Sequence, residues 1–122
     1  MKEIKAYIRL KKAEEVIRAL EKADVPGFTV VEVRALGKAA VPERETLSIE
    51  YAEMYSPITK LEVVCNDDES ERIVALIRES ASTGHRGDGM IFVSDVCCAV
   101  KIRTGERCED GLATGPEKVR PE

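Results

Sequence analysis

The sequence predicts an α+β fold in which two helices cover one face of a four-stranded antiparallel sheet. Four segments alternate apolar and polar residues with the period of a half-buried strand, and two segments place apolar residues at helical spacing. Their order is strand, helix, strand, and then the same again after a long irregular segment. This doubled unit is typical of a ferredoxin-like βαββαβ sandwich, and 122 residues fit one such domain.

The first half of the chain is expected to form a strand, a helix and a second strand. Over residues 12–24 apolar side chains recur at helical spacing, and the Pro-Gly pair at 26–27 ends that helix. The second strand is expected over residues 28–36. The inward-facing positions of the first strand are expected to be Ile4, Ala6, Ile8 and Leu10.

The second half repeats this order after an irregular excursion. Residues 37–57 keep no period, and a loop of about twenty residues inside a compact domain is usually functional or disordered. A strand is expected over 58–65 and a helix over 66–82, whose first turn is acidic, as the helix dipole favours. A glycine-rich loop at 84–89 leads into a last strand, expected over 90–103.

Composition and charge exclude several classes of protein. Hydrophobic residues make up 43% and charged residues 34%, which is typical of a folded soluble protein. The net charge of -4 argues against a nucleic-acid partner. No apolar stretch reaches the length of about 20 residues that spans a bilayer, so we expect a cytoplasmic protein without direct membrane insertion. The sheet face away from the helices needs cover, and neighbouring subunits are its natural source.

A family resemblance is carried by two runs of residues. The run Thr83-Gly84-His85-Arg86-Gly87-Asp88-Gly89-Met90-Ile91-Phe92-Val93, followed by Ile102-Arg103-Thr104-Gly105-Glu106, resembles the C-terminal signature of PII signal-transduction proteins. Phe28 to Val33, Leu36-Gly37 and Glu50-Tyr51 agree with the N-terminal half of that family. The resemblance implies a PII-like domain over 1–112, with an effector loop (T-loop) at 37–57, a phosphate-binding loop at 82–90, a C-terminal loop at 101–112 and a polar tail at 113–122.

The resemblance also implies a regulator rather than an enzyme. It implies a homotrimer with an adenine nucleotide site in each cleft between subunits, and a regulated transporter or enzyme that is contacted through residues 37–57. The positions that match the family's nucleotide site are Thr29, Gly37, Lys38, Val64, Gly87, Asp88, Gly89, Met90, Lys101 and Arg103.

Five positions depart from the family's pattern. Ala39 replaces a glutamine that helps to hold magnesium and 2-oxoglutarate, and Ile58 replaces the lysine that pairs with the keto acid, so 2-oxoglutarate is not expected to bind. Met90 replaces the lysine that meets the outer phosphates, while Lys38 and Lys101 replace arginines and lose their two-pronged contacts. We therefore expect ADP or AMP to bind better than ATP. Bicarbonate is a candidate second effector, in inorganic-carbon or related metabolic regulation, because the departures resemble those of a carboxysome-associated branch that responds to it.

The residues themselves leave several alternatives open. Glycines let successive amides converge on an anion, but this spacing alone also fits an ordinary turn. Lys101 and Arg103 are expected on one strand face, where they either act on one phosphate or form a solvated strand end. Asp88 is assigned to orienting the loop, and His85 either contacts phosphate or is simply exposed.

Tyrosine and cysteine residues suggest further chemistry. Three roles are open for Tyr51. It could accept a nucleotidyl group as in some relatives of the family, anchor a partner protein, or fold back on its own domain. A bridge from Cys97 or Cys98 to Cys108 would form a redox clasp, unless these thiols stay reduced as cytosolic cysteines usually do. With one histidine and no Cys-x-x-Cys pair, no metal site is predicted.

Three other functions stay open. The first is an ordinary nitrogen regulator that senses ATP and 2-oxoglutarate. The second is a weak nucleotide hydrolase, although the usual metal ligands and phosphate-binding lysine are poorly represented. The third is a metal-binding trimer that is similar to copper-tolerance relatives of the fold and relies on the three cysteines.

Overall fold

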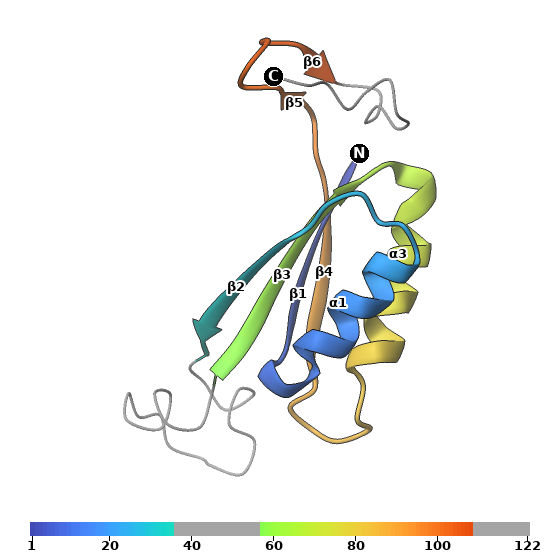
Figure 1. The fold of residues 1–122 in the computed structure, drawn as a ribbon, viewed down its shortest axis with the longest axis vertical. Helices are drawn as coiled ribbons and strands as arrows, with labels where there is room; N and C mark the ends of the chain where they lie inside the picture. The colour runs from blue at the N-terminus through green and yellow to red at the C-terminus, as the bar shows by residue number, and fades with distance from the viewer. Residues whose placement is uncertain (36–56, 109–122) are drawn as a thin grey trace.

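The computed structural model describes residues 1–35 and 57–108 (Figure 1). Its main sheet and helices are formed, in chain order, by β1 (Lys2–Arg9), α1 (Ala13–Lys22), β2 (Thr29–Arg34), β3 (Pro57–Cys65), α3 (Asp67–Ala81) and β4 (Gly89–Asp95). Three shorter elements complete the described chain: the 3-10 helix η1 (Leu10–Lys12) and the strands β5 (Ala99–Val100) and β6 (Arg107–Cys108).

The four long strands form one antiparallel sheet in the order β2-β3-β1-β4. Ala6 in the middle of β1 lies opposite Leu61 of β3 and Ile91 of β4. Both helices lie on the same face of this sheet (Figure 1). The arrangement is the ferredoxin-like α+β sandwich, which confirms the fold class expected from the sequence.

The core lies between the sheet and the two helices. Alternate residues of β1 face it, and Ile4 and Ala6 are fully buried there. Val16 and Leu20 of α1 and Ile73 and Ile77 of α3, spaced by one helical turn, are also inaccessible to solvent. Burial of each such aliphatic side chain contributes about 1.5–3 kcal/mol, so this layer supplies the main driving force for folding.

Among the described residues, no helix lies on the other face of the sheet, and large apolar side chains are exposed there in the single chain. Tyr7 of β1 lies opposite Met90 of β4, and the Tyr7 ring meets the Phe92 ring edge-on at a centroid distance of 6.0 Å. Phe92 is 55% exposed, and Val31 on β2 is similarly accessible. This surface, hereafter the open face, is more apolar than solvent contact alone would favour, as expected for a face covered by another subunit.

Two expectations about strand ends are wrong. Leu10 does not continue the buried face of β1, because the strand stops at Arg9 and Leu10 begins η1, where it is 40% exposed. The last strand does not reach Arg103. The amide of Val96 donates to the carbonyl of Met1 at 3.0 Å, but β4 ends at Asp95, and the residues that follow pair with another strand.

The chain after β4 forms a separate hairpin. β5 and β6 pair with each other, with Ala99 opposite Cys108. The Lys101 amide donates to the Glu106 carbonyl at 2.9 Å, and Gly105, with a φ of 74°, turns the chain and donates to the Lys101 carbonyl at 2.8 Å. Lys101 and Arg103 therefore belong to the tip of a hairpin instead of one strand face. None of the helices in the described ranges is long and apolar enough to cross a membrane.

Candidate functional site

The glycine-rich loop connects the end of α3 to the start of β4. Three of its glycines, Gly84, Gly87 and Gly89, have φ values of 82°, 93° and 113°. Residues with a side chain rarely adopt such left-handed values, so the glycine spacing specifies the path of the loop.

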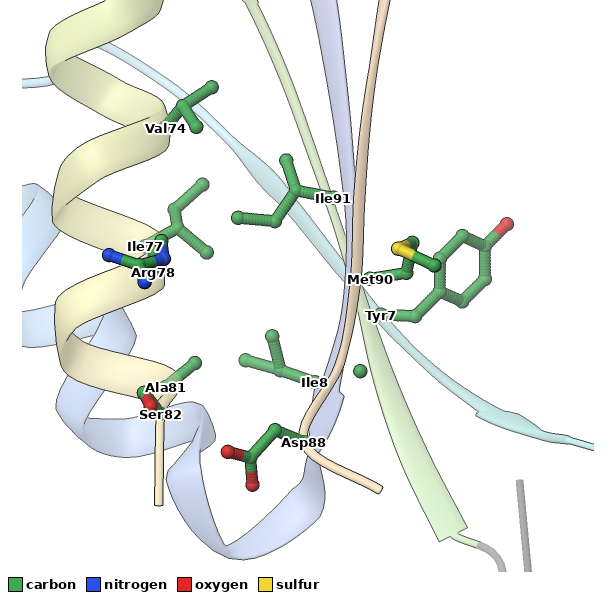
Figure 2. A pocket seen from close by; sticks show the side chains of 11 residues that line it. Tyr7, Ile8, Val74, Ile77, Arg78, Ala81, Ser82, Asp88, Met90 and Ile91 are labelled. Carbon is green, nitrogen blue, oxygen red and sulfur yellow. The ribbon is translucent and has the colours of Figure 1, made fainter. Parts of the chain in front are cut away.

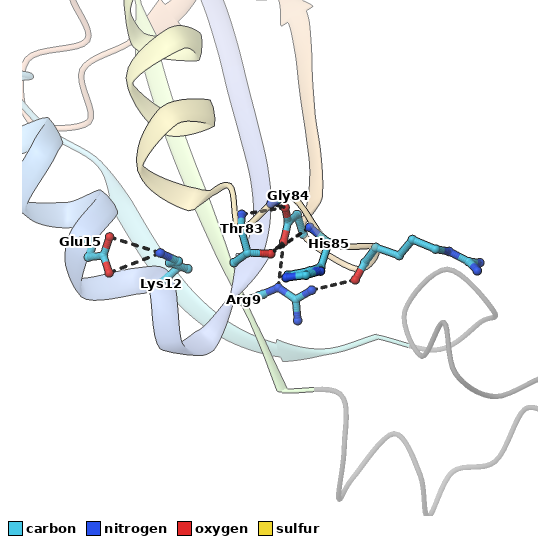
Figure 3. Close-up of polar contacts among 8 residues, drawn as sticks. Arg9, Lys12, Glu15, Thr83, Gly84 and His85 are labelled. Atoms are coloured by element: carbon cyan, nitrogen blue, oxygen red, sulfur yellow. Dashed lines mark hydrogen bonds and ion pairs between the residues drawn. The ribbon is translucent and has the colours of Figure 1, made fainter.

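Asp88 closes the loop on itself through Thr83 and Gly84, which Figure 3 shows close to Arg9. Its carboxylate accepts hydrogen bonds from the amides of Thr83, at 2.8 Å, and Gly84, at 3.0 Å, and also from the Thr83 hydroxyl. The Thr83 side chain and amide, followed by the Arg9 guanidinium and the Gly84 amide, hold the pKa of Asp88 well below its ordinary value. The Asp88 carboxylate is therefore ionised, and it accepts its hydrogen bonds from within the loop, as its predicted orienting role requires.

Arg9 ties the loop to the sheet from the end of β1. Its Nε donates to Asp88 Oδ1 at 3.0 Å and its Nη2 donates to the carbonyl oxygen of Arg86 at 2.7 Å. Arg9 was not among the site residues expected from the sequence. Its only sequence signal is a basic residue at the end of a strand, and its pairing with a loop almost 80 residues later depends on the β1–β4 register.

The amides at the tip of the loop are available to an anion. The amides of Thr83, Gly84 and His85 are satisfied by the Asp88 carboxylate and the Thr83 hydroxyl. Within residues 1–35 and 57–108, no hydrogen bond engages the amides of Arg86 or Gly87. Consecutive free amides next to a left-handed glycine form the kind of concave backbone donor site that binds phosphate. His85 itself is exposed.

Met90, at the start of β4, lies on the open face of the sheet. Its side chain is 61% exposed and lies beside Tyr7 on the open face, on the other side of the sheet from Ile8 and Ile91 (Figure 2). A mostly apolar pocket of about 380 Å³ lies on the helix-covered side, between β4 and α3. Ile77, Ala81 and Ile91 line that pocket, and Asp88 lies at its edge.

The remaining described site residues lie away from the loop. Val64 is opposite Glu3 near the end of β3, and Thr29 is opposite Glu62 on the edge strand β2. Lys101 and Arg103 belong to the β5–β6 hairpin, which follows the far end of β4 (Figure 1). The Lys101 ammonium is 2.8 Å from the Glu106 carboxylate, and both cations are in the tip of that hairpin.

The predicted nucleotide site is thus divided between two regions of one chain. Gly87, Asp88, Gly89 and Met90 come together at the start of β4. The five residues of β4 that follow Met90 separate them from the chain leading to the hairpin by about 17 Å, at about 3.3 Å per residue. Thr29 lies on the opposite edge of the sheet, three strand spacings or about 14 Å from β4. A single chain does not bring these residues around one nucleotide. Gly37 and Lys38 lie outside the described residues, as do Ala39, Tyr51 and the effector loop.

The cysteines differ in accessibility. Cys97 is exposed, and Cys98 and Cys108 are half-buried. Cys65 is buried, and desolvation raises the pKa of its thiol, so it is not suited to thiolate chemistry. Among the residues that the structure describes, no group of three or more histidine, cysteine or carboxylate side chains could hold a metal ion.

Comparisons with known proteins agree with the fold and the loop. The family described as "Nitrogen regulatory protein P-II" matches residues 1–106. The chain is 46% identical over 106 residues to "Nitrogen regulatory protein P-II 2" of Methanothermobacter thermautotrophicus, covering 87% of this chain and 92% of the relative. It is 39% identical over 112 residues to "Nitrogen regulatory protein P-II" of Bradyrhizobium diazoefficiens, covering 92% and 100%. A further relative, "Nitrogen regulatory protein P-II" of Pasteurella multocida, is 38% identical with the same coverage.

The fold and the loop define a ferredoxin-like α+β protein with a glycine-rich loop at one end of its sheet. The match over nearly the whole chain makes the family assignment specific: the chain belongs to the PII family of signal-transduction regulators.

Proposed function

We propose that this protein is a homotrimeric regulator that binds ADP or AMP in clefts between its subunits and signals to a partner protein through residues 37–57. The observation that carries the proposal is the division of the site. The loop amides lie at one end of β4, while Lys101 and Arg103 lie beyond the other end. Neighbouring subunits could bring the loop of one chain to the hairpin of the next.

The exposed open face supports an assembly of this kind. Phe92, Met90 and Val31 would be buried by a neighbouring chain, which contributes favourably to association. The same association would complete the nucleotide site. Binding and oligomerisation are then coupled, because ligand that occupies the cleft contacts two chains at once.

The cations of the proposed site favour a nucleotide with fewer than three phosphate groups. The loop supplies amide donors from Arg86 and Gly87, and the hairpin supplies Lys101 and Arg103, of which Lys101 already pairs with Glu106. Met90 adds an apolar side chain where a lysine would meet an outer phosphate. Without that cation, the contacts of a third phosphate with the protein are worth less free energy than the hydration that the phosphate loses on binding. ATP is therefore expected to bind more weakly than ADP or AMP.

The second effector distinguishes two kinds of metabolic role. The relatives named above are nitrogen regulatory proteins by name. Ile58, at the start of β3, offers no charge to a keto acid, which argues against 2-oxoglutarate. Bicarbonate stays a prediction from the sequence, and with it a role in inorganic-carbon regulation.

Calorimetric titration of the full chain tests this proposal. AMP, ADP and ATP are each titrated with and without 2-oxoglutarate and bicarbonate. We expect binding of ADP or AMP to be tighter than that of ATP, with no gain from 2-oxoglutarate. Absence of binding by all three nucleotides would contradict the proposed function. Tightening of ATP binding by 2-oxoglutarate would instead assign the protein to ordinary nitrogen sensing.

A further inference from the structure

The contact between β1 and the glycine-rich loop uses an arginine and an aspartate that face each other beside the anion site. Arg9 and Asp88 are both half-buried, with side chains 28% and 24% exposed, and their ion pair joins the last residue of β1 to the residue before β4. An acidic side chain beside a phosphate site would by itself repel the ligand. Here its oxygens accept four hydrogen bonds, including one from a cation.

We propose that Arg9 and Asp88 are positioning residues that hold the loop in the shape that leaves the amides of Arg86 and Gly87 free for phosphate. This inference rests on the proposed function, since it concerns the same site. The Asp88 carboxylate accepts hydrogen bonds from the amides of Thr83 and Gly84, which fixes the first part of the loop. Arg9 donates a hydrogen bond to the carbonyl oxygen of Arg86, which orients that peptide group so that its carbonyl faces the guanidinium.

The peptide geometry explains why the Arg86 carbonyl matters. A peptide group is planar, and its N–H and C=O point in opposite directions. When Arg9 holds the Arg86 carbonyl, the amide of Gly87 in the same peptide group points away from Arg9. The guanidinium therefore sets the direction of one of the two free amides without contacting the ligand.

The two contacts of Arg9 need the shape of a guanidinium. Nε and Nη2 donate in fixed directions to two different acceptors, Asp88 and the Arg86 carbonyl. A lysine at this position keeps the charge but offers a single nitrogen on a flexible stem. A purely electrostatic role would survive an arginine-to-lysine change, whereas a positioning role would not fully survive it.

The test compares a ligand that carries phosphate with one that does not. Wild type and the variants Arg9→Met, Arg9→Lys and Asp88→Asn are titrated with ADP and with adenosine. Arg18→Met is the matched control, because Arg18 also pairs with a carboxylate, that of Glu14, but on the solvent side of α1. We expect ADP affinity to fall about tenfold or more in Arg9→Met and Asp88→Asn, the effect of losing a charge-assisted hydrogen bond. The ADP affinity of Arg9→Lys should lie between those of wild type and Arg9→Met. Adenosine affinity should change less than twofold in each of these variants.

Amide hydrogen exchange supplies a measurement that needs no ligand. The amides of Thr83 and Gly84 should exchange slowly in wild type and faster in Asp88→Asn, while the amides of β1 and α3 keep their protection. This measurement decides the question where adenosine binds too weakly to titrate.

Two results would overturn the inference while leaving the proposed function intact. One is unchanged ADP affinity in Arg9→Met and Asp88→Asn. The other is an equal loss of ADP and adenosine binding together with lost protection across the sheet, which would show that the pair only stabilises the fold. Failure of wild type itself to bind ADP, AMP or ATP would instead contradict the proposed function.

Discussion

Gly89 is the residue at which the loop and the sheet meet most closely. It lies opposite Ile8 in the β1–β4 register and has a φ of 113°. A Cβ atom at this position would lie 1.8 Å from the carbonyl oxygen of Tyr7, which is backbone and cannot move independently of β1. The glycine is therefore required by both conformation and space.

Replacement of Gly89 by alanine is expected to destabilise the protein by about 2 kcal/mol or more, because strain and a backbone clash act together. Gly27→Ala is the matched control, since an added Cβ meets no atom within 4 Å there and should change stability by less than about 0.5 kcal/mol. Chemical denaturation of both variants measures the difference. Equal stability of the two variants would show that β1 and the loop are not in this close contact.

Single residues also show the limits of sequence reasoning. The orienting role of Asp88 was predicted, because a carboxylate is an unfavourable neighbour for an anion and was therefore assigned to the loop itself. Arg9 was missed, since the alternating pattern of β1 gives no information about which loop its last residue faces. Leu10 was misassigned because the apolar alternation continues for one residue past the point where the backbone begins a 3-10 turn.

At the scale of elements, the two helices and the first three strands follow directly from periodicity. The observed helices Ala13–Lys22 and Asp67–Ala81 lie within the predicted ranges. The last strand could not be predicted in the same way. Alternation from Val96 to Arg103 fits a strand, but alternation does not reveal which neighbour a strand pairs with, and the β1–β4 pairing ends at Asp95. The residues pair locally instead, as the β5–β6 hairpin.

The β5–β6 hairpin disfavours both predicted bridges to Cys108. Ala99 is the ladder partner of Cys108, so these two side chains lie on the same face of the hairpin. Successive side chains of an extended chain alternate between faces, so the Cys98 side chain points to the other face. Cys97 returns to the face of Cys108, but it is two residues from Ala99, which places its Cα beyond the distance of about 7 Å that a disulfide spans.

Glutathione disulfide is therefore not expected to form a bridge from Cys97 or Cys98 to Cys108 within one chain. Such a bridge would oxidise two thiols while one glutathione disulfide is reduced to two glutathione thiols. Peptide mapping by mass spectrometry identifies any linkage, with Cys97→Ser and Cys98→Ser as paired controls. Complete conversion to a Cys98–Cys108 or Cys97–Cys108 bridge within one chain would contradict the hairpin register.

At the scale of the molecule, the fold could be predicted from the sequence, but the arrangement of the site could not. The family resemblance implied that the glycine-rich loop and the cations at positions 101 and 103 belong to one site. The strand expected between them already separated them along the chain, but the sequence did not reveal that β4 ends at Asp95 and that both cations lie in a hairpin. That hairpin depends on the pairing of β5 with β6, which only the three-dimensional structure provides. The separation along β4 also gives a physical reason for assembly, since the proposed nucleotide site would require a second chain.

The central claim, a nucleotide site shared between chains, is tested most directly by mixing two inactive variants. One carries Lys101→Ala and Arg103→Ala in the hairpin, and the other carries Gly87→Val in the loop, where a φ of 93° disfavours a branched side chain. In a ring of three chains that contains both variants, one junction joins an intact loop to an intact hairpin. Calorimetry should then show that ADP binding, absent from each variant alone, returns at about one site per mixed trimer. Mixed trimers, verified by native mass spectrometry, that fail to bind ADP would contradict a shared site.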